Sequence, residues 1–188
     1  MIIEKIGSST LFLQGFRNAR VGNPEVLLKD LRELFPGVEL QLLRAERVAG
    51  REHLILAATH AIDSFRGKDR RARLLSMEFL LFASGEHQIV EAIKLIGVTP
   101  STTELVVAGI AERETDLNGV TGTISRKANA TPDDAVIELQ SAKKIRSLKK
   151  AYKISDRELE STRVSCETDE MILKRLVIER SAMLVLEN

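Results

Sequence analysis

The hydrophobic pattern of the first quarter of the chain predicts a strand, a helix and a second strand. Residues 10–16 form a short apolar run containing one glycine, which is typical of a strand. Asn23 precedes Pro24, a favourable helix start because asparagine caps the first turn and proline lacks only an N–H that needs no partner there. The apolar stripe of this helix consists of Val26, Leu27, Leu31 and Leu34. After Pro36-Gly37, residues 38–43 alternate in hydrophobicity, which predicts a strand with one buried face.

The clearest periodicity lies in residues 54–65, where apolar side chains recur at helical spacing. These positions are Leu54, Ala57, Ala58, Ala61, Ile62 and Phe65. Residues 74–83 are apolar on nearly every side, which favours a buried helix over a strand. Ser84-Gly85 interrupts this element, a helical stripe restarts over 89–96, and Gly97 stands where a helix C-cap belongs. This part of the chain therefore predicts three consecutive helices.

The rest of the chain predicts one more strand and a helical C-terminal part. Residues 105–110 are a buried strand by pattern, and the polar, glycine-containing residues 113–131 indicate a loop or hairpin. A helix is expected from Pro132, a short one from Ser155 and a longer one over 168–186. The core face expected for the helix from Pro132 is Val136, Leu139, Ile145, Leu148 and Tyr152. With no internal repeat and no long linker, we expect a single α+β domain over residues 1–188, with a small, mainly antiparallel sheet covered by helices.

Composition excludes several classes of protein. The chain has 188 residues, of which 44% are hydrophobic and 29% charged, an ordinary globular balance. Its one cysteine, Cys166, excludes a disulfide framework within the chain and fits a reducing compartment. No apolar run approaches the roughly 20 residues that span a bilayer, and the first residues lack the pattern of a signal peptide. We therefore expect a cytoplasmic protein that has no membrane partner.

The sequence offers no convincing catalytic or metal-binding set. It has no glycine-rich phosphate loop. His53 and His60 are seven residues apart on one predicted helix, about 10 Å along its axis, so one ion cannot bind both. Cys166 lies in an acidic stretch, which disfavours its thiolate. Three carboxylates considered as catalytic candidates show no pairing pattern; they are Glu33, Asp63 and Glu78. We expect no catalytic residue, no metal and no cofactor.

Charge is segregated along the chain although its sum is only +1, from 28 Lys and Arg against 27 Asp and Glu. Residues 66–73, called the basic turn below, contain five Lys or Arg and one Asp, and residues 143–153 contain six and no acid. Residues 156–170 hold six acids against two arginines. The two basic segments are either solvated surface or contacts for a nucleic-acid backbone, because Lys and Arg that neutralise phosphates supply most non-specific affinity for nucleic acids.

Residues 76–98 resemble the central motif of the small kinase-binding subunit of the KEOPS/EKC complex, the Cgi-type family. The family pattern is an apolar helix containing a glutamate, then Ser-Gly-x-Arg-Gln-Ile, then Ala-Ile and an Ile/Leu-Gly pair. Further similar segments are 15–19, 53–58 and 178–184, so the resemblance covers most of the chain. The sequence departs from the pattern at His87, where the family usually has arginine.

The resemblance implies a non-catalytic subunit that binds an atypical small kinase/ATPase and recruits tRNA through its 3′ CCA end for threonylcarbamoyl-adenosine modification. The RNA-binding residues expected are Arg66, Lys68, Arg70, Arg71, Arg73, Ser84, Gly85, His87, Gln88, Lys143 and Lys144. The partner-binding candidates, which could equally be core residues, are Met77, Leu81, Leu184 and Leu186. Two other hypotheses remain open: a protein-only adaptor of the kinase without RNA contact, and a small enzyme.

Overall fold

A central antiparallel sheet organises the chain, of which the computed structural model describes residues 1–67, 70–112, 117–164 and 166–186. The main strand order is β1-β2-β4-β3, and β5 also pairs with β2. The strands are β1 (Ile2–Ile6), β2 (Ser9–Arg17), β3 (Val38–Arg44), β4 (Leu105–Ala111) and β5 (Thr131–Pro132). In the β2–β4 register Phe12 lies opposite Gly109, and a Cβ on that glycine would stand 1.9 Å from the phenyl ring. The α+β class and the antiparallel sheet are confirmed.

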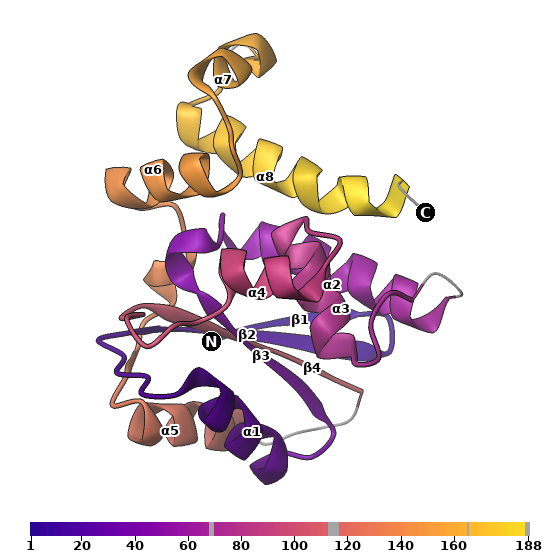
Figure 1. The fold of residues 1–188 in the computed structure, drawn as a ribbon, viewed down its shortest axis with the longest axis vertical. Coiled ribbons are helices and arrows are strands. Elements are labelled where there is room, and N and C mark those ends of the chain that lie inside the picture. The colour runs from indigo at the N-terminus through magenta and orange to yellow at the C-terminus, as the bar shows by residue number, and fades with distance from the viewer. Residues whose placement is uncertain (68–69, 113–116, 165, 187–188) are drawn as a thin grey trace.

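Helices cover both faces of this sheet (Figure 1). The helices on one face are α2 (Arg51–Arg66), α3 (Leu75–Ser84) and α4 (Ile89–Ile96), and those on the other are α1 (Pro24–Leu34) and α5 (Leu117–Lys127). Each face therefore has its own apolar core. The prediction that the strand at 38–43 buries only one face was wrong, because Leu40 and Leu42 contact one core while Leu43 contacts the other.

The C-terminal helices form a third apolar cluster on the outer side of α2 and α3. They are α6 (Ala142–Ala151), α7 (Asp156–Thr162) and α8 (Asp169–Leu186). Figure 1 shows α8 lying across the layer that contains α2 and α3, with which it packs. Two short 3-10 turns connect this cluster to the sheet, η1 (Ala45–Arg47) and η2 (Asp134–Ile137). The sheet therefore supports α2 and α3, and these in turn support α8.

Two secondary-structure predictions for the second half of the chain were wrong, one of a loop and one of a helix. The segment 113–131, expected to be a loop, contains α5. Val120 and Ile124 are buried in the core beside the sheet, and this packing stabilises a helix in a segment that is otherwise polar. The helix expected from Pro132 is divided into β5, η2 and α6. Asp133 caps η2, and Ser141 then starts α6 by accepting a hydrogen bond from the Lys144 N–H.

Smaller differences concern individual positions. Val26 and Leu34, placed in the apolar stripe of α1, are more than half exposed, so Leu27 and Leu31 carry that contact. Gly97 is the C-cap of α4, as expected, although its conformation is extended, whereas Gly85 adopts the left-handed conformation after α3. The strand β1 had not been expected. It has five residues and lies at the edge of the sheet, where it pairs with β2, and a short edge strand gives only a weak hydrophobic pattern. Within the residues described, no helix is long and apolar enough to cross a bilayer.

Candidate nucleic-acid and partner interface

The basic turn is anchored by a buried carboxylate. Glu78 on α3 is completely buried, and its oxygens accept hydrogen bonds from the Ser64 hydroxyl (2.7 Å) and from two backbone N–H groups, of Arg71 (3.1 Å) and Ala72 (2.7 Å). A buried charge is tolerated only when donors satisfy it, and here they come from α2 and from the turn itself. Glu78 therefore fixes the turn's backbone against α2 and α3.

The arginines of the basic turn are not equivalent. Arg66 donates to Ser8, Ser9 and Glu112, each at 2.9 Å, and so ties the end of α2 to the sheet. Arg70 and Arg73 are exposed, and the Arg70 guanidinium stacks 5.0 Å from the Phe65 ring centroid. Lys68, the remaining cation predicted here, lies outside the described residues. Arg70 and Arg73 are thus the two described arginines of the turn best placed for phosphates.

Arg71 turns toward the C-terminal helix. Its guanidinium donates through Nη2 to the carbonyl oxygen of Leu184 in the last turn of α8, and lies 5.6 Å from the Phe82 ring centroid. A cation at this position is favourable because the last carbonyls of a helix lack intrahelical donors and carry a partial negative charge. Arg71 therefore joins the basic turn to α8.

The predicted segment 84–88 also packs against α8. Gly85 has φ +70° and ψ 20°, and a Cβ there would stand 3.1 Å from the Arg180 carbonyl oxygen. The close approach of α8 therefore accounts for a glycine at position 85. The Ser84 hydroxyl is buried, donating to the Leu81 carbonyl and accepting from the Glu86 N–H. His87 and Gln88 are exposed, and Gln88 immediately precedes α4.

The fold brings the basic turn and segment 84–88 near one another through α8. Arg71 contacts α8 at Leu184, and Gly85 contacts it at Arg180. These two positions are four residues apart, about 6 Å along a helix. The predicted RNA-binding residues around Ser84 to Gln88 and those of the basic turn therefore border one surface at the end of α8.

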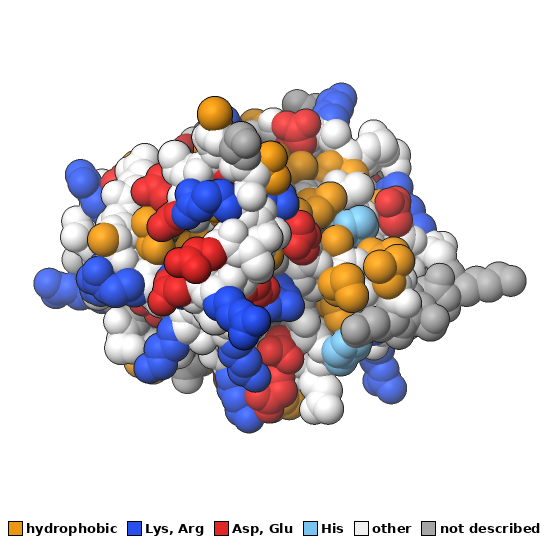
Figure 2. Space-filling model, turned by 90° about the horizontal axis from the view of Figure 1, so that it is seen from above, with side chains coloured by type: hydrophobic (Ala, Val, Ile, Leu, Met, Phe, Trp, Pro, Cys, Tyr) orange, Lys and Arg blue, Asp and Glu red, His pale blue; other side chains and the backbone are white. Residues whose placement is uncertain are grey.

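Exposed apolar side chains complete this surface. Met183, Val185 and Leu186 are 49%, 42% and 75% exposed, and they occupy the last turn of α8 beside the basic turn. Figure 2 shows hydrophobic side chains gathered with histidines toward this end of the outer face. We call Met183, Val185 and Leu186 the apolar end of α8.

Of the four predicted partner-binding residues, only Leu186 is fully on the surface. Leu81 and Leu184 are each 1% exposed and belong to the core of this chain. Met77 is partly buried against the same core. Because Leu81 and Leu184 are buried within this chain, their side chains are not available to a partner protein.

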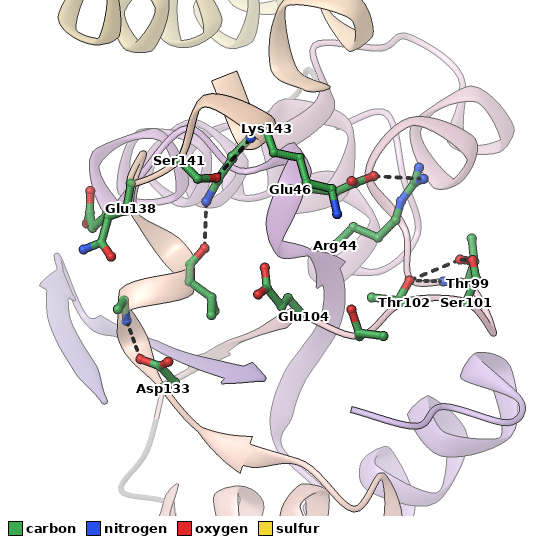
Figure 3. Close-up of a pocket in the computed structure, with 15 residues that line it drawn as sticks. Arg44, Glu46, Thr99, Ser101, Thr102, Glu104, Asp133, Glu138, Ser141 and Lys143 are labelled. Carbon is green, nitrogen blue, oxygen red and sulfur yellow. Dashed lines mark hydrogen bonds and ion pairs between the residues drawn. The ribbon is translucent and has the colours of Figure 1, made fainter. Parts of the chain in front are cut away.

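Lys143 and Lys144 belong to a separate pocket of about 570 Å³. It lies between the end of β3, the segment 99–104, η2 and the start of α6 (Figure 3). Both acidic and basic side chains line it; they are Arg44, Glu46, Glu104, Asp133, Glu138, Lys143 and Lys144. A polyanion would meet four carboxylates here, so the pocket is a poorer phosphate surface than the basic turn.

Lys144 is committed to the fold. Its ammonium is buried and donates to the carbonyl oxygens of Val136 (2.7 Å) and Ile137 (2.8 Å), which end η2. Burial lowers the pKa of Lys144 to about 8, although the nearby carboxylates of Glu138 and Glu104 act in the opposite direction. Lys143 is exposed and faces the pocket (Figure 3).

The two helix histidines are separate packing residues. His53 is buried, its Nδ1 accepts the Ala49 N–H at 3.3 Å, and its ring meets Tyr152 edge-on. Burial lowers the pKa of His53 to about 4, so this ring is neutral at physiological pH. His60 lies against Phe82 instead. Among the described residues, no three His, Cys, Asp or Glu side chains are grouped as they would be around a metal ion.

Sequence reasoning missed two parts of this surface. Glu78 was considered only as a catalytic candidate without a pairing pattern, yet it is the one charged residue in the apolar segment 74–83, and that isolation was the available signal for a buried carboxylate. The apolar end of α8 was only partly anticipated, through Leu186. Met183 and Val185 could not be separated from core positions, because apolar residues occur on both sides of this helix.

Comparison with known proteins identifies the family of this chain. Residues 18–184 match the family described as kinase binding protein CGI-121. The chain is also 32% identical over 145 residues to the regulatory protein Cgi121 of Methanocaldococcus jannaschii, an alignment covering 77% of this chain and 85% of that protein. The matched residues include the whole of the basic turn, segment 84–88 and α8 as far as Leu184. The chain therefore belongs to the CGI-121 family of kinase binding proteins.

Proposed function

We propose that this protein is a non-catalytic regulatory subunit that binds a protein kinase and recruits tRNA through its 3′ CCA end. The resemblance implies that this role belongs to the KEOPS complex, and membership of the kinase-binding family supports it. In that complex the protein would support threonylcarbamoyl-adenosine modification of tRNA. The observation that carries the proposal is the surface formed by the basic turn, segment 84–88 and the apolar end of α8. Exposed Arg70 and Arg73 supply charge for phosphates, and the neighbouring apolar side chains supply a surface for a partner.

Binding of tRNA with and without its terminal CCA tests the RNA part of the proposal. We expect removal of the CCA to weaken binding by the isolated chain at least tenfold, because the single-stranded end would lose its contacts beside segment 84–88. Fluorescence anisotropy at a fixed salt concentration measures this difference. Equal affinity for the two tRNAs would remove segment 84–88 from the RNA surface.

Kinase binding is tested at the apolar end of α8. Replacing Leu186 by aspartate should weaken binding to the cognate small kinase/ATPase subunit by about tenfold or more, because a carboxylate would enter a desolvated contact. Val164→Asp is the matched control, since Val164 is 59% exposed and lies between α7 and α8. Calorimetry should show tight binding for the control. Equal affinity for both variants would place the kinase on another surface.

A second function, as a protein-only adaptor, is favoured by the apolar end of α8 alone. It requires that the basic turn be dispensable and that no tRNA bind at physiological salt. The titration with intact tRNA separates the two functions, since an adaptor would show kinase binding but no saturable tRNA binding.

A further inference from the structure

We infer that Arg71 couples kinase binding at the apolar end of α8 to RNA binding at the basic turn, acting as a positioning residue and not as a phosphate contact. This inference rests on the proposed function, which places the kinase and the RNA on these two neighbouring parts of the surface. Its basis is that residue 71 is held at both ends: the backbone by α3 and the side chain by α8.

The first end is rigid. The Arg71 N–H donates to Glu78, whose carboxylate is completely buried and also binds Ala72 and Ser64. Buried carboxylates with several donors hold one geometry, because any displacement leaves charge and amides unsatisfied. The N–H groups of Arg71 and Ala72 are therefore attached to α3, and a further contact of residue 71 is made by its side chain.

The second end is attached to a helix terminus. Arg71 donates to the carbonyl oxygen of Leu184, in the last turn of α8 that the structure describes. Leu184 itself is buried, while its neighbours Met183, Val185 and Leu186 are largely exposed. Helix ends open locally at low cost. The ordered last turn and its opened form are thus the two states that Arg71 biases.

Coupling follows from the position of the two partners. A kinase that buries the apolar end of α8 stabilises the ordered last turn and with it the Arg71–Leu184 bond. That bond restrains residue 71, which lies between Arg70 and Arg73 in the chain, so the turn loses less freedom when RNA binds. Because linkage is reciprocal, RNA must strengthen kinase binding by the same factor.

Arg71→Met removes the guanidinium and keeps an apolar stem that can pack against Phe82. Arg73→Met is the matched control, since it removes an equal charge from an exposed residue of the same turn. Arg71→Lys keeps a single donor and should restore part of the effect. Purified wild-type chain and these three variants are compared with and without saturating kinase.

The first measurement is tRNA affinity. We expect kinase to tighten tRNA binding to the wild type about fivefold or more, an ordinary size for coupling between sites. The factor should fall to about 1 in Arg71→Met and persist in Arg73→Met, although the control binds tRNA more weakly overall. A wild-type factor of 1, or an undiminished factor in Arg71→Met, overturns the coupling while leaving both binding activities in place.

The second measurement needs no RNA. Hydrogen exchange of the amides of Arg71 and Ala72 should slow at least threefold when kinase binds the wild type, and should not change in Arg71→Met. If tRNA fails to bind at all, the proposed RNA function fails, and this measurement alone decides whether α8 and the turn are coupled. Unchanged exchange in the wild type with kinase bound overturns the inference.

Discussion

Replacing Glu78 by leucine is expected to lower the free energy of unfolding by about 3 kcal/mol. The leucine leaves two backbone N–H groups, those of Arg71 and Ala72, without an acceptor in a buried environment. Each such orphan costs about 1–3 kcal/mol. For a chain of this length the loss corresponds to roughly 6–12 °C in Tm. Urea unfolding followed by circular dichroism measures it.

Two further variants separate the role of the charge from that of the shape. Glu78→Gln keeps one oxygen for the amides but turns an NH₂ group toward donors, so an intermediate loss of about 1–2 kcal/mol is expected. Glu91→Leu is the surface control, because Glu91 forms an exposed ion pair with Lys94, and its loss should stay below about 0.5 kcal/mol. Leucine variants of equal stability at positions 78 and 91 would contradict the anchoring role.

Most elements of this fold could be predicted because their patterns are local. Residues 54–65 show a helical stripe that α2 buries as expected, and Asn23-Pro24 begins α1 with its predicted cap. Ser155 likewise begins α7. In each case a few adjacent residues determine both the conformation and the face that is buried. The strands β2, β3 and β4 and the helices α1 to α4 followed from such local segments, whereas β1, β5 and α5 did not.

The α5 helix could not be predicted, because its segment is rich in threonine, glycine and serine. It has few apolar residues, and its helical form depends on packing of Val120 and Ile124 under the sheet. The helix division near residue 140 has a similar cause, since Lys144 must reach back to η2. In both segments, tertiary contacts therefore determine the secondary structure, which the local sequence preferences do not.

The candidate site was predicted as a set of residues but not as an arrangement. Sequence identified the basic turn, segment 84–88 and Leu186, which the fold brings together. It could not show that Arg71 binds Leu184, 113 positions away, or that Lys144 is buried. Arginines that look equivalent in the sequence differ in how available they are to a ligand. The packing of the fold leaves Arg70 and Arg73 exposed, while Arg66 and Arg71 form hydrogen bonds within the chain.

Reversing the charge of Arg70 and Arg73 together should weaken tRNA binding about 10- to 100-fold near physiological salt. Both side chains are exposed, so the change acts mainly on the surface and leaves the contacts of Arg66 and Arg71 in place. Each phosphate contact contributes about 0.7–0.9 to the slope of log affinity against log salt. Losing two contacts should therefore reduce that slope by about 1.4–1.8.

Lys143→Glu with Arg146→Glu is the control that decides where the RNA lies. Each replacement changes the charge by 2, so both double variants carry the same net charge, 4 lower than the wild type at +1. Lys143 and Arg146 are exposed on α6, and the pocket at its start already contains four carboxylates. If net charge alone governed binding, the two variants would bind tRNA equally and show equal salt slopes. If the basic turn holds the RNA, only Arg70→Glu with Arg73→Glu flattens the slope; a reduced slope confined to the α6 variant would move the RNA surface to residues 143–153.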